Sequence, residues 1–211
     1  KLSTSEKIKR TYDAAFLFKP VGYSKTIESK KVAISVREWS HDDRDQETYC
    51  ELIRVFVKEL VKKNRTVVFL STCQGNSEYV DDSILAKKIR DSLPEKIRQL
   101  TTVDDQYYSL NELKFELTQY DFVVGTRLHM CVLSWLSGTP ALNISYEEKG
   151  KECYDYLELS EYSVDYNEST KCLTQLQQFM ELSELEKRKH FRKVDFIHQE
   201  MKHQLHEVVS N

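Results

Sequence analysis

Glycine and proline are scarce in this chain: its 211 residues include five glycines and three prolines. Flexible linkers and low-complexity segments need far more of both, so the composition favours packed helices and strands. No stretch of about 18 apolar residues occurs and no signal-peptide pattern opens the chain. We therefore expect a cytoplasmic protein with no membrane span, although peripheral association with a membrane stays open.

An excess of positive charge is also absent. Lysine and arginine total 31 against 34 acidic residues, which gives a formal net charge of -3. Nucleic-acid binders carry a strongly basic surface, so we expect no nucleic-acid partner. The five cysteines lie about 20 or more residues apart and form no C-x-x-C pair, so zinc spacing is absent. We expect reduced, buried thiols.

Short apolar runs rich in β-branched residues alternate along the chain with segments of helical periodicity. The expected strands cover residues 31–37, 66–70, 98–103, 121–125 and 140–145. The expected helices cover residues 46–62, 79–92, 109–119 and 127–137, and Gly138 can close the last of these. This alternation predicts an α/β fold: a doubly wound, Rossmann-like parallel sheet with right-handed crossovers.

The two ends of the chain differ from this pattern. Residues 1–30 are mostly polar apart from the apolar residues 14–18, so we expect a linker from an upstream domain that this chain does not contain. Residues 31–168 are the expected Rossmann-like domain, and residues 169–211 a helical extension with repeating apolar faces. That extension could contact another domain, join two copies as a homo-oligomer, or simply flank the sheet as a helix pair.

Ligands of open parallel sheets bind beyond the carboxyl ends of the strands, so the loops there are the first candidates. In one of them, Gly125 allows a sharp turn and Thr126 can cap the next helix, whose free N–H groups suit phosphate or carboxylate. Arg127 adds a planar fork for the same oxygens, and His129 can act as acid or base beside the bound anion. Arg37, at the end of the first strand, is a second cation for this crevice.

Each of these residues also has a structural explanation. An arginine at a helix start can form a surface ion pair, an arginine at a strand end is often solvated, and a histidine on a first helical turn is more often structural than catalytic. The adjacent acids at 81–82 and 104–105 are typical of capping or solvated residues. The tail histidines find no third ligand nearby, so we expect no metal and a solvated polar face made by His190, His198, His203 and His206.

Residues 120–129, with the sequence YDFVVGTRLH, resemble the signature region of polysaccharide pyruvyl transferases. Residues 137–140 (SGTP) and 145–149 (SYEEK) continue this resemblance. Upstream, residues 13–17 (DAAFL) and 32–37 (VAISVR) resemble two further segments of the same family. The resemblance spans roughly residues 12 to 159, and the Arg-Leu-His element is its most specific part.

The resemblance implies the C-terminal domain of a GT-B-like two-domain fold, with phosphoenolpyruvate as pyruvyl donor and a sugar as acceptor. By position, Arg127, Leu128 and His129 match the Arg-Leu-His motif of the family. Arg37 matches its other donor-binding arginine, and Lys149 matches a lysine to which we assign no role. Beyond the donor substrate, no cofactor is implied.

Phosphoenolpyruvate carries a phosphate and a carboxylate, which Arg37, Arg127 and a helix N-terminus could bind, while His129 moves the proton that ketal formation needs. Two alternatives stay open. One is a GT-B glycosyltransferase or sugar-nucleotide epimerase domain, whose donor diphosphate the same helix would hold. The other is a non-catalytic interaction domain of polysaccharide assembly. The arginine pair and the lack of a Glu-x7-Glu element in residues 127–149 favour phosphoenolpyruvate, a small dianion, over a nucleotide sugar.

Overall fold

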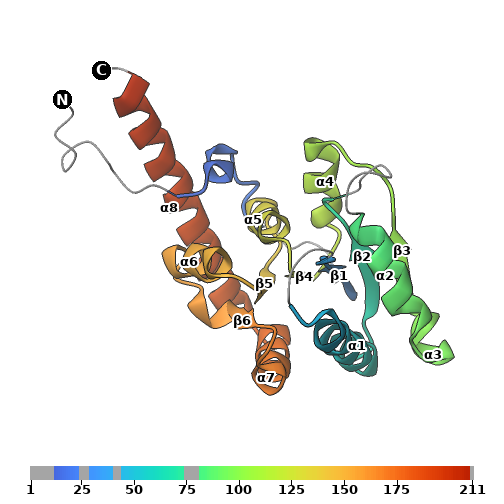
Figure 1. Ribbon diagram of the computed structural model, residues 1–211. Coiled ribbons are helices and arrows are strands. Elements are labelled where there is room, and N and C mark those ends of the chain that lie inside the picture. Colours follow the sequence, from blue (N-terminus) through green and yellow to red (C-terminus); the bar gives the residue numbers. More distant parts are fainter. Residues whose placement is uncertain (1–11, 24–28, 40–43, 74–80, 210–211) are drawn as a thin grey trace.

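Six parallel strands form the centre of the molecule. The computed structural model describes residues 12–23, 29–39, 44–73 and 81–209. In these ranges the strands pair in the order β3-β2-β1-β4-β5-β6 (Figure 1). Their bounds are β1 (Lys31–Ser35), β2 (Thr66–Leu70), β3 (Thr101–Asp104), β4 (Phe122–Gly125), β5 (Ala141–Ser145) and β6 (Ser163–Asp165). Because β1 and β4 are neighbours but not consecutive, the strand order reverses between them, and a ligand is expected to bind beyond their carboxyl ends.

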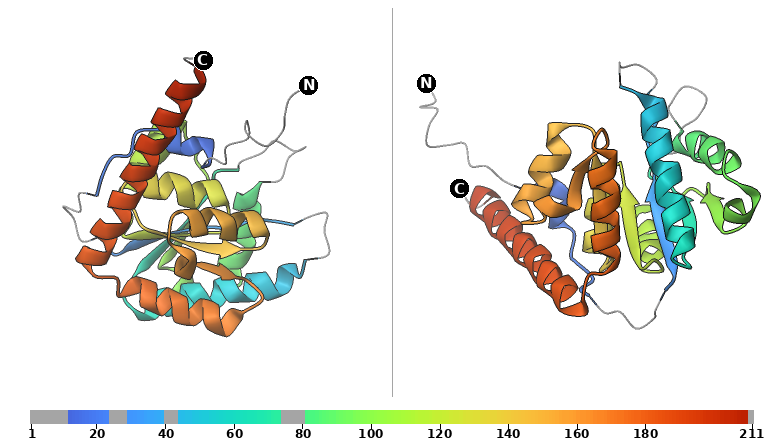
Figure 2. Two further views of the ribbon diagram at one scale, coloured as in Figure 1. Left: turned by 90° about the vertical axis from the view of Figure 1, so that its left-hand side faces the viewer. Right: turned by 90° about the horizontal axis from the view of Figure 1, so that it is seen from below.

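Helices cover both faces of this sheet. They are η1 (Ala14–Leu17), α1 (Gln46–Lys62), α2 (Asp82–Asp91), α3 (Glu95–Arg98), α4 (Leu110–Leu117), α5 (Leu128–Leu136), α6 (Glu148–Tyr156), η2 (Ser160–Tyr162), α7 (Ser169–Met180) and α8 (Glu184–Val209). Helices α1 and α7 pack together on one face, and α4 and α5 pack together on the other (Figures 1 and 2). The predicted doubly wound α/β fold is confirmed.

Local signals explain why these elements begin and end where they do. Strands β4 and β5 are buried at every residue, as strands covered on both faces must be, and their sequences are mostly apolar, with buried Asn143 and Ser145 as the polar residues of β5. Helix α5 ends in a Schellman motif, as predicted for Gly138. That glycine has a φ of +84°, and the Thr139 N–H donates to the Ser134 carbonyl at 3.0 Å.

The predicted boundaries need several corrections. Strand β1 stops at Ser35, so Arg37 lies beyond it, with its backbone N–H donating to the Tyr49 hydroxyl. The strand expected over 98–103 begins only at Thr101, because α3 occupies the preceding residues. Strand β6 was not predicted, since three residues are too few for a recognisable alternation. Of the helix expected over 79–92, the first two residues lie outside the described ranges.

Both ends of the described chain pack against the α/β unit. Phe16 of η1 is buried, and the Nδ1 of His198 in α8 lies 2.8 Å from the Phe16 carbonyl oxygen. Phe191 of α8 contacts Trp135 of α5 and stacks on Tyr23, with ring centroids 5.1 and 4.9 Å apart. The part of the expected linker that can be seen is therefore a packed segment. Residues 1–11 and 24–28 lie outside the described ranges, and the proposed division at 31 and 169 stays a prediction.

The tail histidines do not share one solvated face, which corrects that expectation. His190 and His198 are buried, with 8% and 5% of their surface exposed. His190 packs between aromatic rings of the core, and burial lowers its pKa. His203 is exposed and pairs with Glu207 at 3.2 Å. The described residues contain no group of three or more metal-ligating side chains suited to a metal ion.

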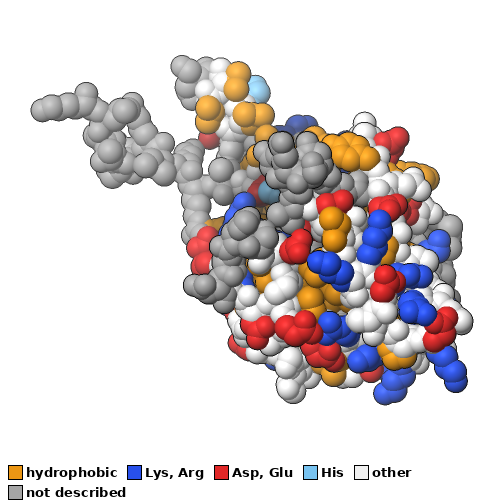
Figure 3. Space-filling model, turned by 45° about the vertical axis from the view of Figure 1, so that its right-hand side comes forward, with side chains coloured by type: hydrophobic (Ala, Val, Ile, Leu, Met, Phe, Trp, Pro, Cys, Tyr) orange, Lys and Arg blue, Asp and Glu red, His pale blue; other side chains and the backbone are white. Residues whose placement is uncertain are grey.

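Charges of both signs are mixed on one face of the molecule, and most of the thiols are buried. On the face that carries α2 to α4, acidic and basic side chains are interspersed rather than gathered by sign (Figure 3). In the described part of the chain, every helix is too short or too polar to cross a membrane. Cys50, Cys131 and Cys172 are buried thiols as expected, whereas Cys73 and Cys153 are half-buried.

Candidate functional site

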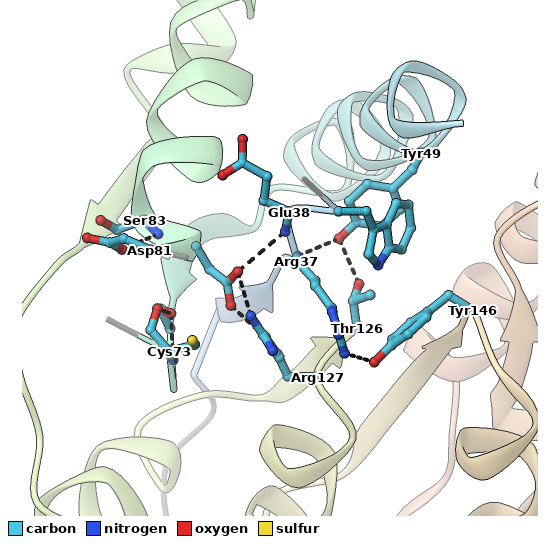
Figure 4. A network of polar contacts seen from close by, with 12 residues as sticks. Arg37, Glu38, Tyr49, Cys73, Asp81, Ser83, Thr126, Arg127 and Tyr146 are labelled. Atoms are coloured by element: carbon cyan, nitrogen blue, oxygen red, sulfur yellow. Dashed lines mark hydrogen bonds and ion pairs between the residues drawn. The ribbon is translucent and has the colours of Figure 1, made fainter. Parts of the chain in front are cut away.

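The loops that follow β1, β2, β4 and β5 bring polar side chains together at the carboxyl edge of the sheet. Arg37 comes from the loop after β1 and Arg127 from the loop after β4, and the two lie side by side in Figure 4. Tyr146 follows β5, and its hydroxyl accepts a hydrogen bond from Arg37. The carboxyl edge of the sheet, where topology predicts that a ligand binds, therefore carries two neighbouring arginines.

Arg127 forms a two-pronged ion pair. It is the N-cap residue of α5, and its Nε and Nη2 donate to the two carboxylate oxygens of Asp82 at 2.7 and 2.9 Å. The Asp82 side chain is fully buried, whereas 21% of the Arg127 side chain is exposed. Burial by itself would lower the pKa of Arg127, but the hydrogen bonds and charge of Asp82 outweigh it and raise the pKa. Arg127 therefore carries a fixed, fully developed positive charge.

Arg37 contacts a tyrosine, and within the described ranges it has no carboxylate partner like that of Arg127. Its guanidinium donates to the Tyr146 hydroxyl and lies over that ring, 4.6 Å from the centroid. Among the described residues, no carboxylate lies within ion-pair distance of Arg37. Burial lowers its pKa, and the neighbouring charge of Arg127 lowers it further. A partly buried cation beside a second cation is an arrangement that a bound anion would stabilise.

A buried pair of hydroxyls fixes the loops that carry the two arginines. The Tyr49 hydroxyl of α1 lies 2.7 Å from the Oγ1 of Thr126 and accepts the N–H of Arg37 at 3.3 Å. Burial raises the pKa of Tyr49 well above its ordinary value, so this hydroxyl stays protonated. Thr126 was expected to cap α5, but Arg127 occupies the N-cap position and the Thr126 side chain is engaged with Tyr49.

Gly125 is required for packing rather than for a turn. Its φ does not fall in the left-handed region that favours glycine. Instead, a Cβ at this position would lie 2.4 Å from the Sγ of Cys131, which is itself buried under the end of β4. Any side chain larger than hydrogen would therefore overlap the Cys131 sulfur and force it to move.

His129 lies at the same helix start as Arg127 but faces a different partner. Its Nε2 is 3.3 Å from a carboxylate oxygen of Asp13, the residue that caps η1, and 56% of its side chain is exposed. Arg127 is held by α2, whereas His129 is held by the segment before η1. The shared crevice for both side chains stays a prediction, because these contacts point to neighbours on different elements.

Leu128 and Lys149 line a separate cavity of about 200 Å³ between η1, α5 and α6. Tyr12, Tyr156 and two carboxylates, those of Asp13 and Glu152, also line it. The cavity adjoins His129 through Asp13. The residues matched to the family by position therefore form two groups. Arg37 and Arg127 lie side by side, whereas Leu128 and Lys149 line the cavity and His129 lies beside it.

Sequence reasoning did not assign two contributors to the site, Asp82 and Arg44. Asp81 is a capping residue as expected, since its Oδ1 accepts the Ser83 N–H at 2.8 Å. Asp82, expected to cap or to be solvated, is buried against Arg127 instead. The Arg44 guanidinium lies over the Tyr146 ring, 5.0 Å from the centroid. Arg44 could have been found from the sequence, because it is a cation in the loop after β1, where a ligand-binding residue is expected.

Comparison with known proteins agrees with this architecture. A family model described as polysaccharide pyruvyl transferase matches residues 1–148. The chain belongs to the polysaccharide pyruvyl transferase family. This family member is 32% identical over 142 residues to the amylovoran biosynthesis protein AmsJ of Erwinia amylovora. The match covers 65% of the chain and 34% of AmsJ, so the chain spans about a third of that relative.

Solved structures similar to this pyruvyl transferase family member are GT-B glycosyltransferases. TarM has a TM-score of 0.59 at 14% identity, over 92% of the chain and 37% of TarM. The trehalose-6-phosphate synthase OtsA has a TM-score of 0.56 at 11% identity, over 82% of the chain and 40% of OtsA. The UDP-forming trehalose-phosphate synthase of Burkholderia vietnamiensis scores 0.54 at 14% identity, over 82% of the chain and 42% of that protein. These similarities concern the fold alone.

Proposed function

We propose that this family member contributes the donor site of an enzyme that moves a pyruvyl group from phosphoenolpyruvate to a sugar of a polysaccharide or its precursor, as a ketal. The observation that carries the proposal is Arg37, a partly buried cation beside Arg127 with no carboxylate at ion-pair distance among the described residues. The family membership and the likeness to a polysaccharide biosynthesis protein support the same reaction class.

Phosphoenolpyruvate suits the charges of this crevice. Its phosphate and carboxylate are anionic groups that arginine forks bind through paired hydrogen bonds. Arg127 keeps its outward edge for such a contact because Asp82 occupies only the Nε side of the guanidinium. The N-terminus of α5, with its unpaired N–H groups, adds a favourable field for either anionic end.

The proposed reaction joins one phosphoenolpyruvate and two sugar hydroxyls. A proton is added to the methylene carbon, which becomes the methyl group, and one hydroxyl oxygen bonds to the adjacent carbon. The bond from that carbon to the phosphate oxygen then breaks and inorganic phosphate leaves, while the second hydroxyl closes the ketal and both hydroxyl protons are released. His129 is the proposed proton carrier, since its exposed ring beside Asp13 can exchange protons with substrate and solvent.

Two variants of the full-length enzyme test these roles. We expect His129→Ala to lower turnover by about 10²- to 10⁴-fold with donor binding largely retained, because an acid or base acts mainly in the transition state. Arg127→Ala should weaken phosphoenolpyruvate binding itself, since the fork contacts the donor in the ground state. The matched control is His203→Ala, which removes an exposed histidine that pairs with Glu207 on the same helix. Near-normal turnover in His129→Ala would remove that histidine from the mechanism.

The same titration distinguishes the proposed donor from the alternative donors. A GT-B glycosyltransferase or epimerase domain would bind a nucleotide sugar in this crevice, and a non-catalytic interaction domain would bind neither compound. Saturable binding of phosphoenolpyruvate, lost in Arg37→Ala, is the result we expect. Binding of a nucleotide sugar without binding of phosphoenolpyruvate would refute the proposed donor. We expect the 211-residue chain alone to be inactive in the transfer assay, because the cleft of a two-domain enzyme needs both halves.

A further inference from the structure

We propose that Asp82 is the positioning residue of the donor site: it holds Arg127 so that one edge of the guanidinium is buried and the opposite edge faces the ligand. This inference rests on the proposed function, and it names a residue that acts through the arginine rather than on the substrate. Three features of Asp82 carry it: its complete burial, the geometry of its ion pair, and the loops that it connects.

The geometry divides the guanidinium into two edges. An arginine has five N–H donors, and Asp82 accepts one from Nε and one from Nη2. The three remaining N–H groups have no partner among the described residues. Because the Asp82 side chain is fully buried and 21% of the Arg127 side chain is exposed, the edge bonded to Asp82 faces the protein interior and the rest can reach solvent or a ligand. Arg127 is thereby restricted to one orientation before any donor binds.

Burial makes this restriction strong. A carboxylate without exposed surface is costly unless a charge and hydrogen bonds compensate it, so Asp82 keeps its charge only while Arg127 stays in place. Swinging Arg127 out to solvent would leave that carboxylate uncompensated. An ordinary surface ion pair has no such penalty and leaves both side chains free to move.

Asp82 also connects the two arginine loops. Its Oδ1 lies 3.4 Å from the backbone N–H of Glu38, the residue next to Arg37. Its own N–H donates to the Cys73 carbonyl at 3.1 Å, which joins the start of α2 to the loop that follows β2. One carboxylate therefore contacts the loop after β1 and the loop after β4, so it influences the spacing between Arg37 and Arg127.

Asp82→Asn is the decisive variant, with Asp81→Asn as its matched control. The first keeps the size of the side chain and an oxygen for the Glu38 N–H, but it removes the charge and cannot accept both guanidinium bonds. The second makes the same chemical change one residue away, where asparagine still caps α2 and no contact with Arg127 exists. Both variants are made in the full-length enzyme, alone and combined with Arg127→Ala.

We expect Asp82→Asn to raise the KM for phosphoenolpyruvate by roughly 10- to 100-fold, the loss of a hydrogen bond to a charged group, with a smaller change in kcat. Asp81→Asn should leave KM unchanged. The double variant Asp82→Asn with Arg127→Ala should bind donor no worse than Arg127→Ala alone, because the carboxylate acts through the arginine. Equal KM values for Asp82→Asn and Asp81→Asn, or multiplied effects in the double variant, would overturn the inference.

A second measurement does not depend on the donor. The Nε–H resonance of Arg127 in the NMR spectrum should be protected from solvent exchange in the unmodified enzyme and in Asp81→Asn, and exposed in Asp82→Asn. If this protection is seen but phosphoenolpyruvate does not bind, the proposed function fails and the positioning role stands. If the donor binds and neither KM nor the resonance responds to Asp82→Asn, the positioning role fails and the proposed function stands.

Discussion

Replacing Gly125 by alanine tests how tightly the site is packed onto the sheet. The added Cβ would lie 2.4 Å from the Cys131 Sγ, whereas an ordinary van der Waals contact begins at 3.4 Å. Since Cys131 is fully buried beneath the end of β4, the overlap cannot be relieved by moving its sulfur into solvent. Overpacking of this kind costs about 1–3 kcal/mol. For a chain of this size, that lowers the melting temperature by about 2–12 °C.

A double-variant cycle supplies the test by calorimetry or by circular dichroism. Cys131→Ala alone leaves a small cavity and should cost about 1 kcal/mol. Because it removes the atom that the new Cβ meets, the double variant Gly125→Ala, Cys131→Ala should melt close to Cys131→Ala rather than lower than either single variant. Additive losses would show that the Cβ meets some other obstacle and would refute the packing account of Gly125.

Three further predictions concern other parts of the chain. Tyr146→Phe keeps the ring beside Arg37 but removes the hydroxyl, and should raise the KM for phosphoenolpyruvate by roughly 2- to 12-fold without changing the melting temperature. Burial lowers the pKa of His190 below its unfolded value of about 6.5, so the stability it contributes is present above that pH and lost as pH falls through the lowered value. His190→Gln should therefore flatten the fall of melting temperature in acid, and an unchanged slope would contradict this account. Ser109→Ala removes the capping box with Glu112 and should cost about 1 kcal/mol in urea unfolding, whereas Ser109→Asp should cost far less.

Hydrophobic periodicity was enough to predict most of the architecture. Helix α1 has the predicted bounds, because its apolar positions repeat at helical spacing over 17 residues and Asp45 caps its start. Strands β2, β4 and β5 were found because buried parallel strands consist of apolar, β-branched runs. The errors lie where this signal is short or interrupted. Strand β6 has three residues, and just beyond the end of β1 the Arg37 N–H donates to the hydroxyl of Tyr49, a residue 12 positions away, instead of to a neighbouring strand.

The candidate site could be predicted only in part, because its contacts join residues far apart in the chain. The position of Arg127 in the loop after β4 indicated a binding residue, because ligands of open parallel sheets bind beyond the carboxyl ends of the strands. The role of Asp82 could not be read in the same way. Asp81 and Asp82 look alike in sequence, and only the folded sheet brings one of them to Arg127 across 45 positions while the other caps α2.

Helix α8 has a consequence for any shortened version of this protein. Its His198 contacts the carbonyl of Phe16, and Phe16 follows closely after Asp13, the carboxylate beside His129. Removing residues 169–211 to isolate the sheet would therefore remove one of the two helices, α5 and α8, that η1 packs against, and would weaken the support of the acidic neighbour of the proposed proton carrier. Helix α8 stabilises the position of η1 near the other end of the chain. A shortened protein that still folds would therefore test His129 in altered surroundings.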